Sequence, residues 1–308
     1  MSAPLLKLGT RKSPLAMVQA EETRARLCAA HGWEESAVEL VPVIASGDRI
    51  QDRPLAEIGG KALWTKELDG WLQEGRIDAS VHSMKDVETI RPEWLAIAAV
   101  LPRADRRDRM VGAASIAALP QNAIVGTSAP RRAAQLLHAR PDCTVVPIRG
   151  NVATRPAKLA AGEVQATFLA AAGLERLGEH GVGHALEVDD WLPAPAQGAI
   201  GIECRADDKR TLDLLAAIDH PRSHAEVLAE RALLCGLGGT CHSPVAALSE
   251  GEGEHIALTA AIFGTDGAQR IAGRVTLAVG DEGTPRRLAA DLLARAPDSV
   301  RALFGGAA

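Results

Sequence analysis

Short runs of β-branched and apolar residues alternate with helix-like segments over roughly the first 200 residues of the chain. Neighbouring parallel strands need a crossover of about a dozen residues or more, which is usually a helix. The alternation is therefore typical of parallel α/β units. The predicted strands are residues 5–9, 38–44, 79–82, 95–100, 123–126, 144–148, 167–170 and 200–203.

Two segments of different composition interrupt this alternation. A run of alternating charges follows Pro102, and a proline-rich stretch follows Asp190. Both are typical of linkers, so we expect two α/β domains joined by two crossings of the chain. The first comprises residues 1–102 and 199–219, and the second residues 103–198. Residues 220–308 change to a helix, a hairpin and a last helix, which predicts a third, smaller α+β domain.

Local signals mark several element boundaries. Ser13 can cap a helix whose first turn contains Pro14. Gly264 to Gly267 lie between two apolar runs, which indicates a hairpin. The last helix is predicted to have Thr284 as its cap and Pro285 in its first turn.

The charge balance argues against a nucleic-acid partner. The chain has 34 Lys and Arg against 39 Asp and Glu, a net charge of −5. Proteins held to nucleic acid by their overall field usually carry a clear basic excess. Aromatic residues are only 3% and Tyr is absent, so stacking platforms for single strands are not expected either. Any anion site must arise from local clustering of basic residues.

The sequence also predicts the compartment. The longest stretch without a charged residue, Met110 to Pro130, contains Pro120, Gln121 and Asn122, which excludes a membrane-spanning helix there. The N-terminus has no apolar core typical of a signal peptide. Five cysteines, an odd number, agree with a reducing compartment. We expect a cytoplasmic protein, monomeric by default, with no membrane association.

Common cofactor motifs are absent from the sequence. There is no glycine-rich dinucleotide fingerprint and no phosphate loop. Cys235, Cys241 and His242 supply only three candidate metal ligands in a glycine-rich segment. The sequence predicts no metal site.

Basic and hydroxyl side chains follow several predicted strands, where helices begin. In open α/β sheets ligands bind at the carboxyl ends of strands, and helix N-termini favour anions. Any one of these arginines could be a solvated side chain, but three equivalent clusters favour a ligand with several carboxylates or phosphates. The clusters are Arg11 with Ser13; Thr127 and Ser128 with Arg131 and Arg132; and Arg149 with Arg155.

Two further residues have chemistry suited to such a site. Asp86 follows the predicted strand 79–82, and surrounding positive charge would keep it ionised. It could stabilise a cation on a reacting substrate, or it could be a structural salt-bridge partner. Cys241 follows three glycines and a threonine that can expose its thiol, although spacing alone equally allows a buried, inert cysteine.

Six segments together resemble one known family, the porphobilinogen deaminases, also called hydroxymethylbilane synthases. The similarity covers nearly the whole chain, and the order of the segments matches as well. They are Gly9–Ala16, Gly59–Lys61, Val81–Asp86, Gly126–Ser128 with Arg131 and Arg132, Arg149–Val152 with Thr154 and Arg155, and Gln197–Ala199.

The resemblance implies three domains, of which the first two are like the lobes of a two-lobed periplasmic-binding-protein-like fold. It implies a transferase that joins four porphobilinogen molecules head to tail, with loss of ammonia, and releases 1-hydroxymethylbilane for tetrapyrrole biosynthesis. It also implies a dipyrromethane cofactor held through a thioether. The other hypothesis left open is a non-catalytic two-lobed binding protein for polyanionic small molecules.

The resemblance assigns roles to residues of this chain. Asp86 matches the catalytic carboxylate, and Cys241 matches the cysteine that holds the cofactor, with Cys235 as the alternative thiol. The residues matched to binding of substrate or cofactor carboxylates are Arg11, Ser13, Lys61, Ser83, Lys85, Thr127, Ser128, Arg131, Arg132, Arg149 and Arg155. The chain departs from the family pattern at Glu57, Ala62, Glu88, Ala129 and Ala196, the last of which stands where glycine is frequent.

Overall fold

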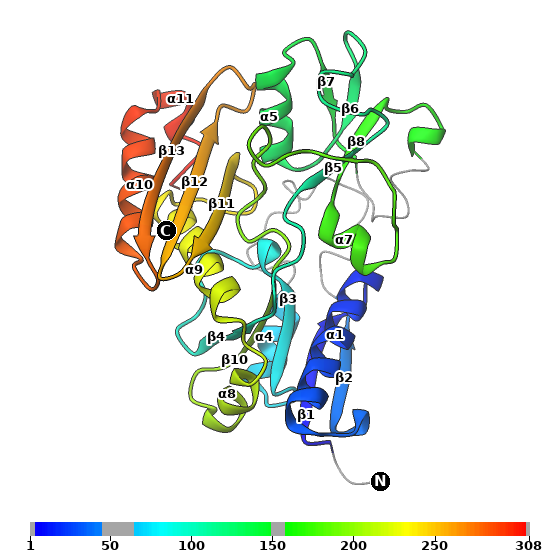
Figure 1. Cartoon of the computed structure of the whole chain (residues 1–308), viewed down its shortest axis with the longest axis vertical. Helices are drawn as coiled ribbons and strands as arrows, with labels where there is room; N and C mark the ends of the chain where they lie inside the picture. Colours follow the sequence, from blue (N-terminus) through cyan, green and yellow to red (C-terminus); the bar gives the residue numbers. More distant parts are fainter. Residues whose placement is uncertain (1–3, 45–64, 149–157, 306–308) are drawn as a thin grey trace. The chain divides into compact units, whose positions relative to one another are not determined.

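The computed structural model of the chain describes residues 4–44, 65–148 and 158–305 (Figure 1). The chain divides into two compact units. One contains Met1–Ala104 and Ala199–His224, and the other contains Asp105–Gly198 and Ala225–Ala308. The further division of the second unit into a lobe and a third domain stays a prediction.

The first unit contains a five-stranded sheet in the order β2-β1-β3-β10-β4. Strand β1 pairs in parallel with β2 and β3, whereas β10 runs antiparallel to β3 and β4. The strands are β1 (Leu6–Arg11), β2 (Val38–Val43), β3 (Ala79–Ser83), β4 (Leu95–Val100) and β10 (Ile200–Arg205).

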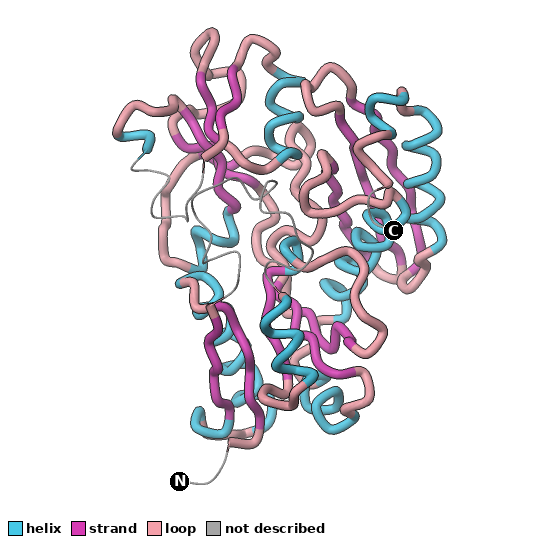
Figure 2. The backbone as a smooth tube through the Cα atoms, turned by 180° about the vertical axis from the view of Figure 1, so that it is seen from behind, coloured by secondary structure: helices cyan, strands magenta, loops and turns pink. Residues whose placement is uncertain are grey.

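Helix α1 lies beside β1 and β2 of this sheet in both views (Figures 1 and 2). Its inner face and the sheet bury apolar side chains such as Leu8, Leu27 and Ile202, all 0% exposed. Burial of each such side chain stabilises the fold by about 1.5–3 kcal/mol. The helical elements of this unit are α1 (Pro14–His31), η1 (Glu35–Ala37), α4 (Lys66–Gln73), η2 (Met84–Asp86) and α8 (Lys209–Ala216).

The second unit contains a five-stranded sheet in the order β7-β6-β8-β5-β9. Strand β6 pairs in parallel with β7 and β8, and β5 runs antiparallel to β8 and β9. The elements are β5 (Asp108–Val111), β6 (Ile124–Gly126), α5 (Pro130–Ala139), β7 (Thr144–Val146), β8 (Ala166–Ala170), α7 (Ala171–Arg176) and β9 (His184–Ala185).

The two five-stranded sheets share one plan. In each, the second strand in the order has two parallel neighbours, and the fourth strand is antiparallel to both the third and the fifth. This repeated plan confirms the predicted class of two α/β lobes. The sequence patterns do not predict β5 and β9. The charged run that ends at Arg109 is typical of a linker, but β5 begins inside that run at Asp108.

A third sheet, also in the second unit, is antiparallel in the order β11-β12-β13 and confirms the small α+β region. Helix α10 packs on β12 and β13 (Figure 1). A cluster that includes Ala134 of α5, Leu248 and Phe263 joins this sheet to α5. The elements are α9 (Pro221–Gly236), β11 (Val245–Glu252), β12 (His255–Phe263), β13 (Arg270–Ala278), α10 (Gly283–Arg295) and α11 (Asp298–Arg301).

Most of the predicted boundary signals are confirmed. Ser13 is the N-cap of α1 and Pro14 its first residue, and the predicted hairpin turn joins β12 to β13. The cap predicted at Thr284 is wrong, because α10 already begins at Gly283. The carboxylate of Asp281 instead accepts hydrogen bonds from the N–H groups of Gly283 and Thr284. Among the described residues, no helix has the length and apolar character needed to cross a bilayer.

Candidate active site

A cavity in the first unit lies at the carboxyl ends of β1 and β3. These strands are parallel, so their ends, at Arg11 and Ser83, meet at one edge of the sheet. The polar side chains lining the cavity are Arg11, Ser13, Gln19, Thr65, His82, Ser83 and Asp86. The structure therefore brings together four of the predicted site residues, which come from β1, the N-cap of α1, β3 and η2.

Asp86 is held at the end of a short 3₁₀ turn. The turn begins at Met84, whose N–H donates to the carbonyl of Ala199 at 3.1 Å. The N–H of Val87 then closes the turn by donating to the carbonyl of Met84 at 3.3 Å. Met84 is 1% exposed, so its buried side chain anchors the turn while Asp86, which is half-buried, faces the cavity.

Gln19 is a cavity residue that the sequence analysis missed. It lies on the buried face of α1 and is 3% exposed. Its Nε2 donates to Ser83 Oγ at 2.8 Å, which joins the helix to the end of β3. A polar residue at a buried helical position was the available signal, but periodicity alone does not distinguish it from a solvated glutamine.

His82 is the second cavity residue that the analysis missed. It is 5% exposed, and its Nε2 lies 2.8 Å from Ser80 Oγ and 3.4 Å from Glu203 Oε2. Burial, reinforced by the positive charge of Arg91, lowers the pKa of His82 to about 3. The imidazole is therefore neutral at neutral pH and contributes no charge to the cavity.

Arg91 is the centre of an ion-pair network around the same strands. Its guanidinium donates to Asp69 at 2.6 Å, to Glu88 at 2.8 Å and to Glu203 at 2.9 Å. Burial alone would lower the pKa of Arg91, but the carboxylates of Asp69 and Glu203 outweigh burial and raise it. Glu203 is 0% exposed, so this network connects β10 to α4 and to the segment between η2 and β4.

One further predicted residue of the first unit is described by the structure, and three other predicted residues are not. Lys85 is in the turn of Asp86 and half-buried, but it does not line the cavity. Lys61, Arg149 and Arg155 lie outside the described residues, so their roles stay predictions.

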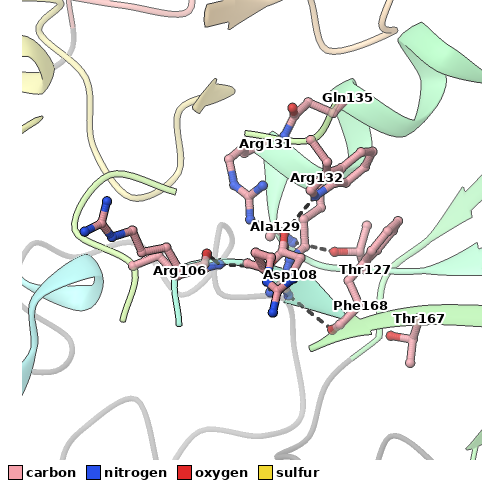
Figure 3. A network of polar contacts seen from close by, with 12 residues as sticks. Arg106, Asp108, Thr127, Ala129, Arg131, Arg132, Gln135, Thr167 and Phe168 are labelled. Carbon is pink, nitrogen blue, oxygen red and sulfur yellow. Dashed lines mark hydrogen bonds and ion pairs between the residues drawn. The ribbon is translucent and has the colours of Figure 1, made fainter. Parts of the chain in front are cut away.

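In the second unit, the predicted hydroxyl residues follow β6 directly. Thr127 Oγ1 accepts a hydrogen bond from the N–H of Ala129 at 3.2 Å. Ser128 is exposed, and its Oγ donates to the carbonyl of Ile148 at 2.9 Å. Both hydroxyls thus shape the turn before α5, the helix whose first turn contains the two adjacent arginines (Figure 3).

Arg131 and Arg132 are buried, at 4% and 6% exposure, and both pair with Asp108 at 2.7 Å. Figure 3 shows the Asp108 side chain beneath the start of α5, facing Arg132. Burial alone would raise the pKa of Asp108, but the charges of Arg131 and Arg132 outweigh burial and hold it well below its usual range. Two guanidinium groups and one carboxylate leave this cluster with one net positive charge.

The five cysteines differ in exposure and environment. Burial raises the pKa of Cys204 to about 12, and burial also raises the pKa of Cys143. The Sγ of Cys235, a half-buried residue, accepts a hydrogen bond from Arg286 at 3.3 Å. Cys241, by contrast, is exposed. Its turn is closed by the N–H of Thr240, which donates to Ser243 Oγ at 3.0 Å.

The repeated sheets and the cavity define a two-lobed α/β protein with arginine, hydroxyl and carboxylate groups at the carboxyl ends of its strands. Comparison with family models identifies the family. The model "Porphobilinogen deaminase, dipyromethane cofactor binding domain" matches residues 6–213, and "Porphobilinogen deaminase, C-terminal domain" matches residues 224–295. The chain belongs to the porphobilinogen deaminase family.

Curated relatives agree with this assignment. The porphobilinogen deaminase of Sphingopyxis alaskensis is 57% identical over 97% of this chain and 96% of its own length. That of Paracoccus denitrificans is 50% identical, with 95% of each chain covered.

Solved structures similar to this chain include two periplasmic or substrate-binding domains. The BvgS periplasmic VFT2 domain of Bordetella pertussis is 15% identical, with 70% of this chain and 87% of that chain covered and a TM-score of 0.41. The GlnP substrate binding domain 2 of Lactococcus lactis, in its open conformation, is 9% identical. The match covers 70% of this chain and 87% of that chain, with a TM-score of 0.43.

Proposed function

We propose that this chain joins four porphobilinogen molecules head to tail, releasing ammonia at each step, and then frees 1-hydroxymethylbilane by hydrolysis. Membership of the family supports the reaction. The observation that supports specific roles for individual residues is the cavity lined by Arg11, Ser13, Ser83 and Asp86. A single cavity there combines groups that bind carboxylates with a carboxylate that can stabilise a cation.

Asp86 is the catalytic residue in this proposal. Loss of ammonia from porphobilinogen leaves a delocalised positive charge on the substrate pyrrole. The carboxylate of Asp86, fixed by its buried turn, accepts hydrogen bonds from pyrrole N–H groups and stabilises that charge where it develops. Interactions that strengthen as charge develops accelerate the reaction, whereas equal binding of substrate and transition state does not.

The arginine and hydroxyl residues bind carboxylates. Each substrate pyrrole carries an acetate and a propionate, and Arg11 with Ser13 and Ser83 supplies donors for such groups in the cavity. In the second unit the net positive charge of Arg131, Arg132 and Asp108 supports the same role. Neutral His82 leaves the attraction for carboxylates to the arginines.

Cys241 holds the dipyrromethane cofactor. An exposed thiol and a net-positive arginine pair in the same unit fit a carboxylate-bearing pyrrole group attached through sulfur. When bound, the cofactor supplies the nucleophilic pyrrole carbon that starts the chain. The buried thiols of Cys143 and Cys204, with raised pKa values, are poorly suited to attachment.

The proposal includes the organisation of the protein. Residues 1–102 with 199–219 and residues 103–198 would be the two lobes, and residues 220–308 would be the domain that carries the cofactor. The protein would act as a cytoplasmic monomer.

Intact mass spectrometry and turnover assays test this proposal. Protein produced in a host that makes porphobilinogen should carry the mass of a two-pyrrole adduct. Cys241→Ser should lose the adduct, whereas Cys235→Ser should keep it. Asp86→Asn should keep its fold and lose about 10²–10³ in kcat. Asp213→Asn, an exposed position on α8, is the matched control and should turn over normally. An adduct on Cys241→Ser, or near-normal turnover by Asp86→Asn, would contradict the proposal.

A further inference from the structure

Asp108 is a buried carboxylate that accepts hydrogen bonds from four other side chains. It is 0% exposed at the start of β5. Its Oδ2 accepts from Arg131 Nη2 at 2.7 Å and from Trp191 Nε1 at 2.8 Å. Its Oδ1 accepts from Arg132 Nη2 at 2.7 Å and from Gln197 Nε2 at 2.9 Å. Four side chains from three parts of the second unit therefore converge on one carboxylate.

The contacts fix the orientation of both arginines. Arg132 uses Nε, at 3.2 Å, and Nη2 together on the Asp108 carboxylate, and its Nη1 donates to the carbonyl of Phe168 at 3.2 Å (Figure 3). Arg131 donates from Nη1 to the carbonyl of Leu192 at 2.7 Å. A guanidinium held on two sides loses little rotational freedom when it meets a ligand.

The contacts also set the charge of the cluster. Two adjacent buried guanidinium groups would repel each other and carry a large desolvation cost without an anion. Burial lowers the pKa of Arg131, and the charge of Asp108 counteracts this by raising it. With Asp108 ionised, one positive charge remains. Among the described residues, the buried Nε of Arg131 has no hydrogen-bond partner, so the protein leaves one donor of the pair unused.

We propose that Asp108 is a positioning residue, an internal carboxylate that orients Arg131 and Arg132 and leaves the pair one positive charge for one ligand carboxylate. This inference rests on the carboxylate-binding role proposed above for the two arginines. Asp108 itself contacts no ligand carboxylate, because like charges repel. It acts on the substrate only through the arginines.

Steady-state kinetics of the full-length holoenzyme with porphobilinogen test the inference. Asp108→Asn removes the charge and one acceptor but keeps the side-chain shape. Its KM should rise about tenfold, whereas its kcat should stay within about twofold of the wild-type value. A carboxylate contact remote from the reacting carbon has the same strength in the ground state and the transition state, so its loss weakens binding without slowing the chemical step. Asp105→Asn is the matched control. Asp105 pairs with Arg107, is less buried than Asp108, and should keep the wild-type KM when substituted.

A double variant separates positioning from general stabilisation. Arg132→Gln alone should also raise KM. If Asp108 acts through the arginines, Asp108→Asn combined with Arg132→Gln should raise KM much less than the product of the two single effects. The double variant has one net positive charge in the cluster, as the wild type does. If Asp108→Asn alone does not fold, the KM of the double variant can therefore be compared with the KM of Arg132→Gln instead. A further tenfold rise over Arg132→Gln would then overturn the inference.

Three further results would contradict the proposed role of Asp108. An unchanged KM in folded Asp108→Asn, with only a lower unfolding temperature, would make Asp108 a purely structural residue. A loss confined to kcat, or single effects that multiply in the double variant, would also refute positioning of carboxylate-binding arginines. Failure of the wild-type protein to form a linear tetrapyrrole would instead contradict the proposed function, so the two failures are distinguishable.

Discussion

Gly201 is a position where a single methyl group should disturb both stability and catalysis. It is the second residue of β10, opposite His82 of β3 and Val100 of β4. A Cβ added there would overlap Met84 Sδ and lie 2.7 Å from Met84 Cγ. Met84 begins the turn that presents Asp86, so Gly201→Ala would displace the turn of the residue proposed to be catalytic.

The expected magnitude follows from the packing. Met84 is 1% exposed and cannot move into solvent without rearrangement. Overpacking of a buried site costs about 1–3 kcal/mol, which corresponds to a decrease of about 2–12 °C in unfolding temperature for a protein of this size range. A shift of the turn by a fraction of an ångström to one ångström should lower kcat by about 10- to 100-fold.

Thermal unfolding by circular dichroism and turnover of porphobilinogen measure the two effects. Gly70→Ala is the matched control, because Gly70 lies in α4 of the same unit and a Cβ added there would have no atom of the described residues within 4 Å. Alanine also favours helix over glycine by about 1 kcal/mol. Combining Gly201→Ala with Met84→Ala should cost less than the sum of the two single losses. Wild-type unfolding temperature and turnover in Gly201→Ala would refute the reasoning.

Three further changes test other features of the fold. Ala196 has φ 60°, a left-handed conformation that glycine adopts with less strain than alanine. Ala196→Gly should therefore raise the free energy of unfolding by about 0.5 kcal/mol, once the greater chain entropy of glycine in the unfolded state is subtracted. A lower unfolding temperature in this variant would contradict the prediction. Gly267→Ala should destabilise the protein by at least about 2 kcal/mol, because φ is 74° and the new Cβ would lie 2.6 Å from Leu137 Cβ. Gly253 also has a positive φ, but a Cβ there would have no atom of the described residues within 4 Å, so Gly253→Ala should cost less in the same denaturant titration. Since the folded pKa of His82 is depressed from 6.5 to about 3, its contribution to stability is present above pH 6.5 and decreases as the pH falls. The free energy of unfolding should therefore fall between pH 6.5 and 5 in the wild type and less steeply in His82→Asn, whereas equal slopes would contradict the assignment of a neutral imidazole.

The sequence was sufficient to predict the parts of the fold that depend on local patterns. The parallel strands, the Ser13 cap and the β12–β13 hairpin each leave a periodic or turn signal within a few residues. The meeting of Arg11 with Ser83 also follows from such signals, because the carboxyl ends of neighbouring parallel strands lie at one edge. Very short elements such as β9, of two residues, leave no pattern to detect.

Contacts between residues distant in the sequence could not be predicted in this way. Glu203 reaches Arg91 across 112 positions, and Trp191 reaches Asp108 across 83. No spacing rule relates such pairs, because their proximity results from the strand order of the folded sheet. The resemblance to a family assigns roles to Asp86 and Cys241, and these roles stay predictions, but it gives no information about Arg91 or Glu203.

The charged run that ends at Arg109 shows why alternating charge is an ambiguous signal. Such a run is typical of a solvated linker, and Arg107 indeed pairs with Asp105 near the surface. Asp108 belongs to the same run, yet it is 0% exposed because Arg131 and Arg132 supply the positive charge that makes its burial tolerable. A buried carboxylate needs its cationic partners to be folded around it, so composition near Asp108 could not reveal its burial. The two arginines carry the complementary signal, since a pair of adjacent cations inside a helix start implies an anion from elsewhere in the chain or from a ligand. On this reasoning Asp108 is the anion from elsewhere in the chain, and the one net positive charge that remains on the two arginines would bind a ligand carboxylate.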